Sequence, residues 1–261
     1  MQERHPDIAM LRHKLSHFSE TVPEDEYDAL AAVFGPPVFV ERGESFVVQN
    51  SRPTRCSLLL SGFAGRSVLL RGGDEQTTAI HVAGDFVDLH ALLLNSLDHR
   101  IVALTPCQIA TANRRSLEQL IAAYPKLSRA LWFLTVVDAA VHRRWLTVLG
   151  RRSALGRCAH LVCEMHARLD DVGLVDNGRF RLPLSQARIG DMLALSAVHI
   201  NRVIQDLRSS GLLTWERGTV TILDFDGLAA VGEFEPSYLQ ISPRPRVDAG
   251  HGRRSVLTAI A

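Results

Sequence analysis

The stretch LSQARIGDMLALSAVHINRVIQDLRSSGLL, residues 184–213, carries the apolar spacing of two short helices joined by a tight turn. Ser185 and Ser196 stand where each helix would begin, and serine is a favoured N-cap because its hydroxyl accepts a free backbone N–H. Gly190 leaves room for the second helix to cross the first closely. The buried face of the second helix would be formed by Ile200, Val203, Ile204 and Leu207.

The remaining positions of that second helix are exposed or lie at its N-terminal end. They comprise Ala197, Val198, His199, Asn201, Arg202 and Gln205. Side chains so placed reach base edges when a helix enters the major groove of DNA. After Gly211, two strand-forming runs flank Arg217, which predicts a hairpin wing that places this arginine beside a phosphate. The order helix, turn, helix, wing therefore favours a DNA-binding domain.

Two other classes of protein fit the sequence less well. An enzyme is not favoured, because no Gly-x-Ser-x-Gly, His-Glu-x-x-His or phosphate-binding loop occurs. A cyclic-nucleotide-binding signalling module without a role on DNA would have no use for a wing and a capped recognition helix.

Composition sets the broad class. A chain of 261 residues exceeds the usual size of one domain, so two domains are expected. The formal net charge of +1 means that any DNA-binding face must be local. No signal peptide or apolar run of membrane length is seen, which predicts a cytoplasmic protein without a membrane partner. The four cysteines lack the spacing of a zinc site or iron–sulfur cluster, and the sequence assigns no metal ligands.

The spacing of the apolar residues changes near residue 116. Residues 36–110 are short apolar runs cut by glycines, which predicts an antiparallel sandwich or roll. From Ser116 onward the spacing is helical, and Pro125 is expected in the first turn of a helix over 125–149. The segment GRRSAL after this helix breaks the pattern and predicts a hinge, which is followed by an amphipathic helix and a short strand.

The helix over 125–149 carries a seven-residue apolar repeat, which predicts a dimerisation seam. The residues that repeat every seven positions are Leu127, Leu134, Val141 and Val148. The intermediate positions are filled by Ala130, Val137 and Arg144. Because Leu131, Trp132 and Trp145 supply a second apolar flank, packing of this helix on its own domain stays an alternative, and both contacts are compatible.

A glycine-punctuated roll (VERGE, LLLSGFAG, HVAGDFV), a long helix and LSAVHINRVIQDLRSSGLL with a wing resemble the Crp/Fnr family of bacterial transcription regulators over about residues 20–226. The resemblance implies an α+β fold, a homodimer on a two-fold symmetric operator, and RNA polymerase as a further partner. Four segments follow: an N-terminal cyclic-nucleotide-binding-like β-roll at 21–124, a dimerisation helix at 125–150, a winged helix-turn-helix domain at 151–226 and an irregular tail at 227–261.

The same resemblance assigns roles in the recognition helix. The family's base-reading positions fall on Ala197, Val198 and Arg202, with Ser196 near a phosphate. Ala197 and Val198 replace the usual Arg-Glu pair, so the operator is expected to differ from the usual family sequence.

The effector is expected to differ from that of the cyclic-AMP-binding members of the family, which carry a Gly-Glu for the ribose and an Arg-Ser/Thr for the phosphate. Here Asp88, His90, His99 and Arg100 form the candidate effector pocket, and two acidic residues near Arg100 would repel a phosphate. We expect a regulator that does not depend on cyclic AMP. A cyclic-nucleotide-responsive regulator with a divergent phosphate site is the alternative.

The cofactor is left unassigned. Residues 1–55 contain no cysteine, which excludes the N-terminal cluster of the oxygen-sensing branch of the family. A haem or metal ion held by His81, His90 and His99 stays open, although scattered histidines of this kind are more often solvated or hydrogen-bonded.

Overall fold

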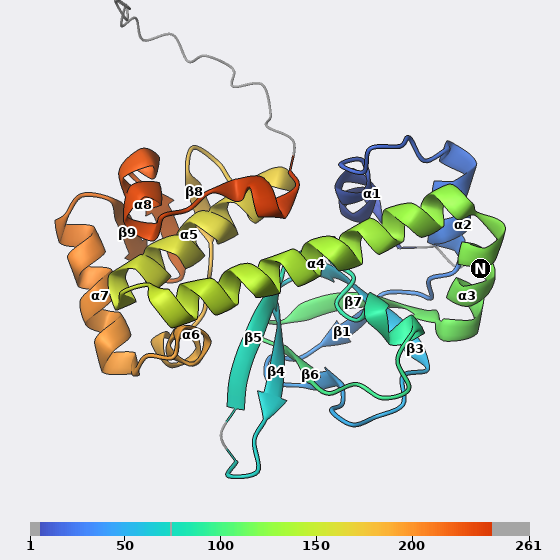
Figure 1. The fold of residues 1–261 in the computed structure, drawn as a ribbon, viewed down its shortest axis with the longest axis horizontal. Coiled ribbons are helices and arrows are strands. Elements are labelled where there is room, and N and C mark those ends of the chain that lie inside the picture. Colours follow the sequence, from blue (N-terminus) through green and yellow to red (C-terminus); the bar gives the residue numbers. More distant parts are fainter. Residues whose placement is uncertain (1–5, 74, 242–261) are drawn as a thin grey trace, which may run out of the picture.

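The computed structural model describes residues 6–73 and 75–241 (Figure 1). Its longest element is the helix α4 (Pro125–Arg151), which runs along the molecule from the N-terminal part to the C-terminal part (Figure 1). Buried apolar residues form two cores, and α4 contributes Leu127 and Leu131 to the first and Val141 and Trp145 to the second. The long helix α4 therefore packs against both cores.

The N-terminal part is an antiparallel β-roll. Its strands are β1 (Val38–Val40), β2 (Ser45–Val47), β3 (Arg55–Ser61), β4 (Ala64–Leu69), β5 (Glu75–His81), β6 (Arg100–Ala103) and β7 (Cys107–Asn113). They form two sheets, in the orders β1-β7-β3 and β2-β6-β4-β5. The helical elements are α1 (Ala9–Leu15), α2 (Glu24–Ala32), η1 (Leu89–Leu92) and α3 (Arg114–Ala123).

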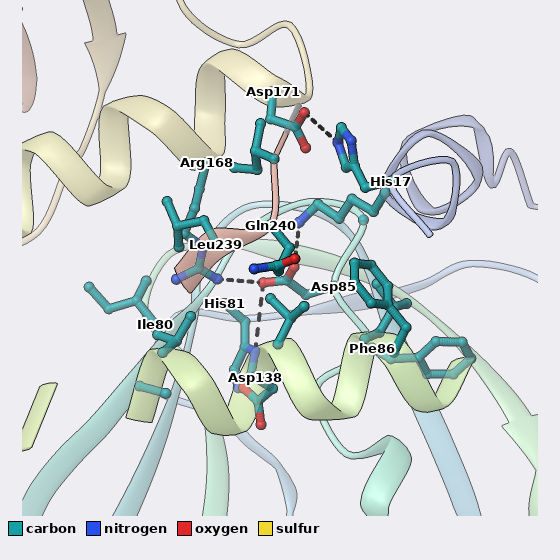
Figure 2. A pocket seen from close by; sticks show the side chains of 18 residues that line it. His17, Ile80, His81, Asp85, Phe86, Asp138, Arg168, Asp171, Leu239 and Gln240 are labelled. Carbon is teal, nitrogen blue, oxygen red and sulfur yellow. Dashed lines mark hydrogen bonds and ion pairs between the residues drawn. The ribbon is translucent and has the colours of Figure 1, made fainter. Parts of the chain in front are cut away.

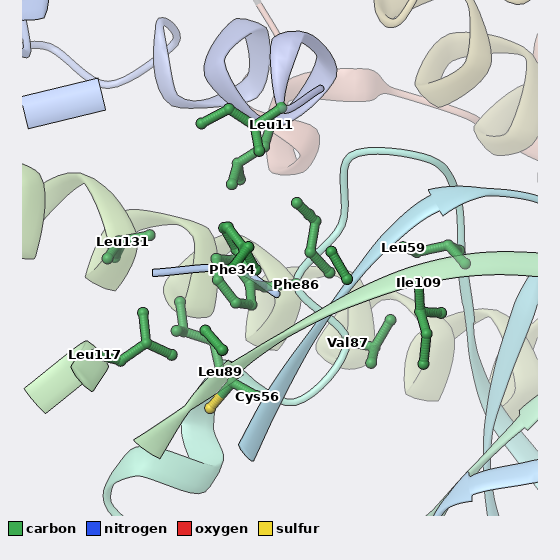
Figure 3. Packing of buried hydrophobic residues seen from close by; sticks show 14 of the residues in the cluster. Leu11, Phe34, Cys56, Leu59, Phe86, Val87, Leu89, Ile109, Leu117 and Leu131 are labelled. Atoms are coloured by element: carbon green, nitrogen blue, oxygen red, sulfur yellow. The ribbon is translucent and has the colours of Figure 1, made fainter. Parts of the chain in front are cut away.

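Helices cover the roll and complete its core. Figure 3 shows Leu11 of α1, Leu117 of α3 and Leu131 of α4 around Phe34 and Phe86. The two phenylalanine rings are tilted, with centroids 5.5 Å apart. Because α1 belongs to this core, the predicted domain start at residue 21 is too late.

The C-terminal part begins after a break at Arg152, in the segment where the sequence predicted one, and Ser153 caps the following helix α5 (Ala154–Asp171). It continues with β8 (Arg179–Arg181), α6 (Gln186–Leu193), α7 (Ala197–Ser209), β9 (Leu213–Glu216), β10 (Thr219–Ile222), α8 (Phe225–Gly232) and η2 (Pro236–Leu239). The three strands form one antiparallel sheet in the order β8-β10-β9.

The prediction of an irregular chain from residue 227 is wrong up to residue 241; the rest of that tail lies outside the described residues. α8 packs so closely on α5 that a Cβ at Gly232 would lie 2.7 Å from the backbone nitrogen of His160. Tyr238 is buried, and its hydroxyl donates to Glu164 of α5 at 2.6 Å. These contacts could not be predicted from the sequence after residue 227, because their partners in α5 lie about 70 residues away.

Candidate nucleic-acid interface and effector site

The helices α6 and α7 form the predicted helix-turn-helix. The Ser185 hydroxyl accepts a hydrogen bond from the backbone N–H of Arg188 at 3.2 Å, and the Ser196 hydroxyl accepts one from the backbone N–H of His199 at 3.2 Å. Both predicted N-caps are therefore present. The turn between the helices contains Ala194 in the left-handed conformation, with φ of 53°.

Gly190 sits where α6 meets this turn. A Cβ at Gly190 would overlap the carbonyl oxygen of Leu195, whose own backbone N–H donates to the Gly190 carbonyl at 2.9 Å. A small residue is therefore required at position 190, as predicted, but the backbone of the turn imposes this requirement and the crossing helix does not.

Gly190→Ala is expected to lower the free energy of unfolding by about 1–3 kcal/mol, because the added methyl meets backbone that cannot rotate away. Urea denaturation followed by circular dichroism measures the change. Gly35→Ala is the matched control, since its added Cβ would lie at an ordinary 3.7 Å from the nearest heavy atom. Equal stability of both variants would contradict this account of the turn.

The two faces of α7 differ as the sequence predicted. Ile200, Val203, Ile204 and Leu207 are buried, whereas the side chain of Val198 is 74% exposed. Ala197, His199 and Arg202 are exposed beside it. Together with the cap residue Ser196, these residues form a surface free to enter a DNA groove.

Asn201, also predicted to contact DNA, makes a contact within the chain. It is half-buried, and its amide donates to Oε1 of Gln186 at 3.2 Å. The structure thus uses Asn201 to join α7 to α6.

The hairpin after α7 is the predicted wing. Arg217 and Gly218 both have positive φ, 48° and 72°, which gives the two-residue turn that suits a twisted hairpin. Arg217 is exposed at this tip. Arg208 of α7 pairs with Glu216 of the wing at 2.9 Å, which holds the tip beside the recognition helix.

The predicted effector residues do not form one pocket; they enter three separate contacts. Asp88 is buried, and its carboxylate accepts from the Ser57 backbone N–H at 2.6 Å. The rings of His90 and His99 lie 5.1 Å apart. Arg100 instead pairs with Glu75 at 2.6 Å.

Burial also shifts the ionisation of these groups. Desolvation raises the pKa of Asp88 to about 7 and lowers the pKa of His90 to about 4. An aspartate side chain is never a cation, and burial disfavours the cationic form of His90, so neither suits the phosphate of a bound nucleotide.

The buried cation beside α4 is Arg66, which the sequence analysis did not single out. Its guanidinium donates to the Asp138 carboxylate of α4 at 2.9 Å and to the Val87 carbonyl at 2.9 Å. A neighbouring contact joins it to Nε2 of His142 at 3.0 Å. Arg66 is thus neutralised by a carboxylate of the same chain, 72 residues away in sequence.

Asp88→Asn tests the buried carboxyl. A carboxyl whose pKa rises from its ordinary 3.8 to about 7 on folding contributes stability at low pH that is lost as the pH rises through this window. We expect the variant to gain stability relative to the wild type by about 1.4 kcal/mol per pH unit across this window. Urea denaturation of both proteins at pH 5, 6, 7 and 8 measures it. A difference independent of pH would contradict it.

The predicted dimer seam lies largely inside the chain. Leu127 is buried in the first core and Val141 in the second, Val148 is also buried, and Leu134 and Val137 are half-buried. The apolar repeat therefore describes packing of α4 on its own domains, the alternative left open by the sequence.

A second stripe of α4 is exposed instead. Trp132 is 67% and Leu146 is 73% exposed, and Val136 lies between them on the same face. Residues at alternating spacings of four and three continue this stripe, which we call the outer α4 stripe: Trp132, Val136, Ala139, Arg143, Leu146 and Gly150. Such spacing is typical of a helix that packs against a second helix.

The structure gathers three metal-ligating side chains where the sequence assigned none. Within residues 6–73 and 75–241, the group that brings three ligand atoms together is His13, His17 and Asp171, and His81, His90 and His99 form no such group. All four cysteines are free and buried, and burial raises the pKa of Cys158 and Cys163 to about 12. None of the described helices is long and apolar enough to cross a bilayer.

Comparison with known proteins agrees with this geometry. Residues 37–124 match the sequence model of the cyclic nucleotide-binding domain, and residues 156–231 match that of the Crp-like helix-turn-helix domain. A sensor roll joined to such a domain defines a class of DNA-binding transcription regulators, not enzymes. The chain belongs to the Crp/Fnr family.

Relatives of known name support this membership. The chain is 30% identical over 192 residues to the transcriptional activator protein FnrA of Stutzerimonas stutzeri, covering 74% of this chain and 78% of that protein. It is 24% identical over 211 residues to the fumarate and nitrate reduction regulatory protein of Salmonella typhimurium, covering 81% and 84%. Its fold is similar to that of FixK2 from Bradyrhizobium japonicum, with a TM-score of 0.68 and 23% identity over 75% of this chain and 96% of that one.

Proposed function

We propose that the protein acts as a homodimer on a two-fold symmetric operator, where it regulates transcription with RNA polymerase as a further partner. The observation that carries this proposal is the exposed first turn of α7, capped by Ser196 and flanked by Arg202 and the wing residue Arg217. This surface offers a guanidinium to base edges and another to a phosphate. A bacterial regulator bound to the chromosome works in the cytoplasm.

The outer α4 stripe supports the homodimer. Large apolar side chains such as Trp132 and Leu146 are seldom left exposed in contiguous patches unless they meet a partner. Leu93, which is exposed, and Leu94 line a hollow with Trp132, so the apolar surface extends from α4 onto the segment after η1. Association of two chains about a two-fold axis that runs beside α4 would bury both patches and present two α7 helices to DNA.

Independence from cyclic AMP is supported by the pairing of Arg66 with Asp138. A cyclic phosphate at this position would have to displace the half-buried Asp138 carboxylate from the buried guanidinium, which costs more than filling an open anion site. The alternative is a regulator that binds a cyclic nucleotide at a divergent site. Calorimetric titration with cyclic AMP distinguishes them: micromolar binding that tightens operator affinity would favour the alternative.

Salt-dependent DNA binding tests the function itself. We expect the purified protein to bind random duplex DNA with an affinity that falls steeply between 50 and 200 mM salt, because phosphate contacts release counterions (about one unit of slope per phosphate). Fluorescence anisotropy of a labelled duplex measures this. Absence of binding at low salt would refute the proposed function.

A further inference from the structure

Two histidines of the N-terminal segment face a single carboxylate of the DNA-binding domain. His13 lies in α1 and His17 follows it by four residues, so that both side chains project from one side of this helical segment. Nε2 of His13 lies 2.9 Å from Oδ1 of Asp171, and Nε2 of His17 lies 2.8 Å from the same oxygen. Figure 2 shows Asp171 at the end of α5 pointing toward His17 across the gap between the two parts of the molecule.

These three side chains differ in exposure in a way that suits a ligand-binding site. The Asp171 side chain is 5% exposed and that of His17 is 11% exposed, whereas that of His13 is 41% exposed. The Asp171 carboxylate is therefore enclosed in the interface, and His13 is the member of the group most open to solvent.

An adjacent ion network holds the two segments in place. Lys14 of the same helix forms an ion pair with Asp85, and Arg168 of α5 donates to the same carboxylate at 2.8 Å (Figure 2). Arg168 also pairs with the buried Glu164 at 3.3 Å. The backbone positions of α1 and α5 are thus set by contacts that do not involve the three ligand atoms, which preorganises the group.

The donor set identifies the class of ion. Two imidazole nitrogens and one carboxylate oxygen suit divalent first-row transition ions such as Zn²⁺, whereas Mg²⁺ and Ca²⁺ take oxygen ligands. The three ligand atoms all lie within 4.8 Å of one another. A tetrahedral ion with ligands at ~2.0 Å separates neighbouring ligand atoms by about 3.3 Å, which small side-chain rotations would reach here.

We propose that His13, His17 and Asp171 form a binding site for a divalent transition-metal ion of the zinc class, which links the N-terminal helix of the sensor domain to the first helix of the DNA-binding domain. A tetrahedral ion takes its fourth ligand from outside this set. Leu11 and Leu15 of α1 belong to the first core and Leu169 of α5 to the second, so the bound ion would tie the two cores together.

Calorimetric titration of the full chain, stripped with a chelator, with zinc chloride tests this proposal. We expect about one Zn²⁺ per chain, and we expect His13→Ala, His17→Ala and Asp171→Asn each to weaken binding by about 100-fold or more, because each removes a ligand. His199→Ala, which removes an exposed imidazole outside the group, should bind zinc as the wild type does. Magnesium chloride should give no binding.

A second readout separates metal binding from misfolding. Zinc should raise the thermal unfolding midpoint of the wild type but not that of Asp171→Asn, while both unfold cooperatively in chelator. No uptake of zinc by the wild type, or unchanged uptake by all three variants, would overturn the proposal. Neither outcome bears on the proposed operator, because the titration contains no DNA.

Discussion

Replacing both Trp132 and Leu146 by glutamate is expected to convert the protein into a monomer with little remaining operator affinity. Each substitution would place an unpaired charge in the centre of the proposed interface, and symmetry repeats it in the partner. An uncompensated buried charge costs ~3–5 kcal/mol, so the two positions together should weaken dimerisation by more than about 1,000-fold. A monomer reaches only one half-site, and operator affinity falls with it.

Light scattering for mass and anisotropy for operator binding measure these effects. Leu69→Glu is the matched control, because Leu69 is exposed on β4 rather than on the outer α4 stripe. Val141→Glu should behave differently, since Val141 is buried in the second core and its loss should unfold the domain. An unchanged dimer mass for the double variant would show that the outer α4 stripe is not the interface.

Arg202→Ala and Arg217→Ala are expected to change DNA binding in different ways: the first should reduce sequence preference and the second should reduce affinity for all sequences. Arg202 lies one helical turn beyond Val198 on the exposed face of α7, where a guanidinium can donate two bonds to O6 and N7 of guanine. Its loss should cost ~1–3 kcal/mol per half-site and relax the base preference at one symmetric position. Arg217 is expected to contact a phosphate, so its loss should weaken all sequences alike and reduce the salt slope by about one.

Titrations against the preferred operator and random DNA at several salt concentrations separate the two roles. Both variants remove one exposed guanidinium, so each serves as the charge-matched control for the other. Full discrimination between operator and random DNA by Arg202→Ala would show that α7 does not read bases through this residue.

Much of the nucleic-acid interface was predictable because its signals are local. The caps Ser185 and Ser196, the apolar face of α7 and the glycine at the wing tip each act within a few residues, and all appear in the structure. The surface role of Arg217 follows from the same short range. Helix caps and tight turns of this kind can be predicted without knowledge of the tertiary fold.

Contacts between distant segments were not predictable. Arg66 and Asp138 are 72 residues apart, and the residues next to each of them in sequence do not indicate that they form an ion pair. The spacing of His13 and His17 is visible in the sequence, but Asp171 is 154 residues from His17 and completes the group only in the fold. The engagement of Asn201 by Gln186 likewise depends on the crossing of two helices.

The apolar repeat of α4 shows a different limit. A helix that packs on two cores along one side and exposes apolar side chains along the other carries two apolar stripes with the same period, so periodicity alone does not assign them. Leu127 and Val148 proved to be buried within the chain, and Trp132 and Leu146 exposed. Only burial distinguishes the two stripes.

Selection of binding sites from randomised duplex DNA with the purified full-length protein tests the central claim most directly. The account predicts enrichment of a two-fold symmetric sequence whose half-sites lie roughly 10 base pairs apart, with two chains bound per duplex. Enrichment of an asymmetric site bound by a single chain, or no enrichment over random DNA, would contradict it.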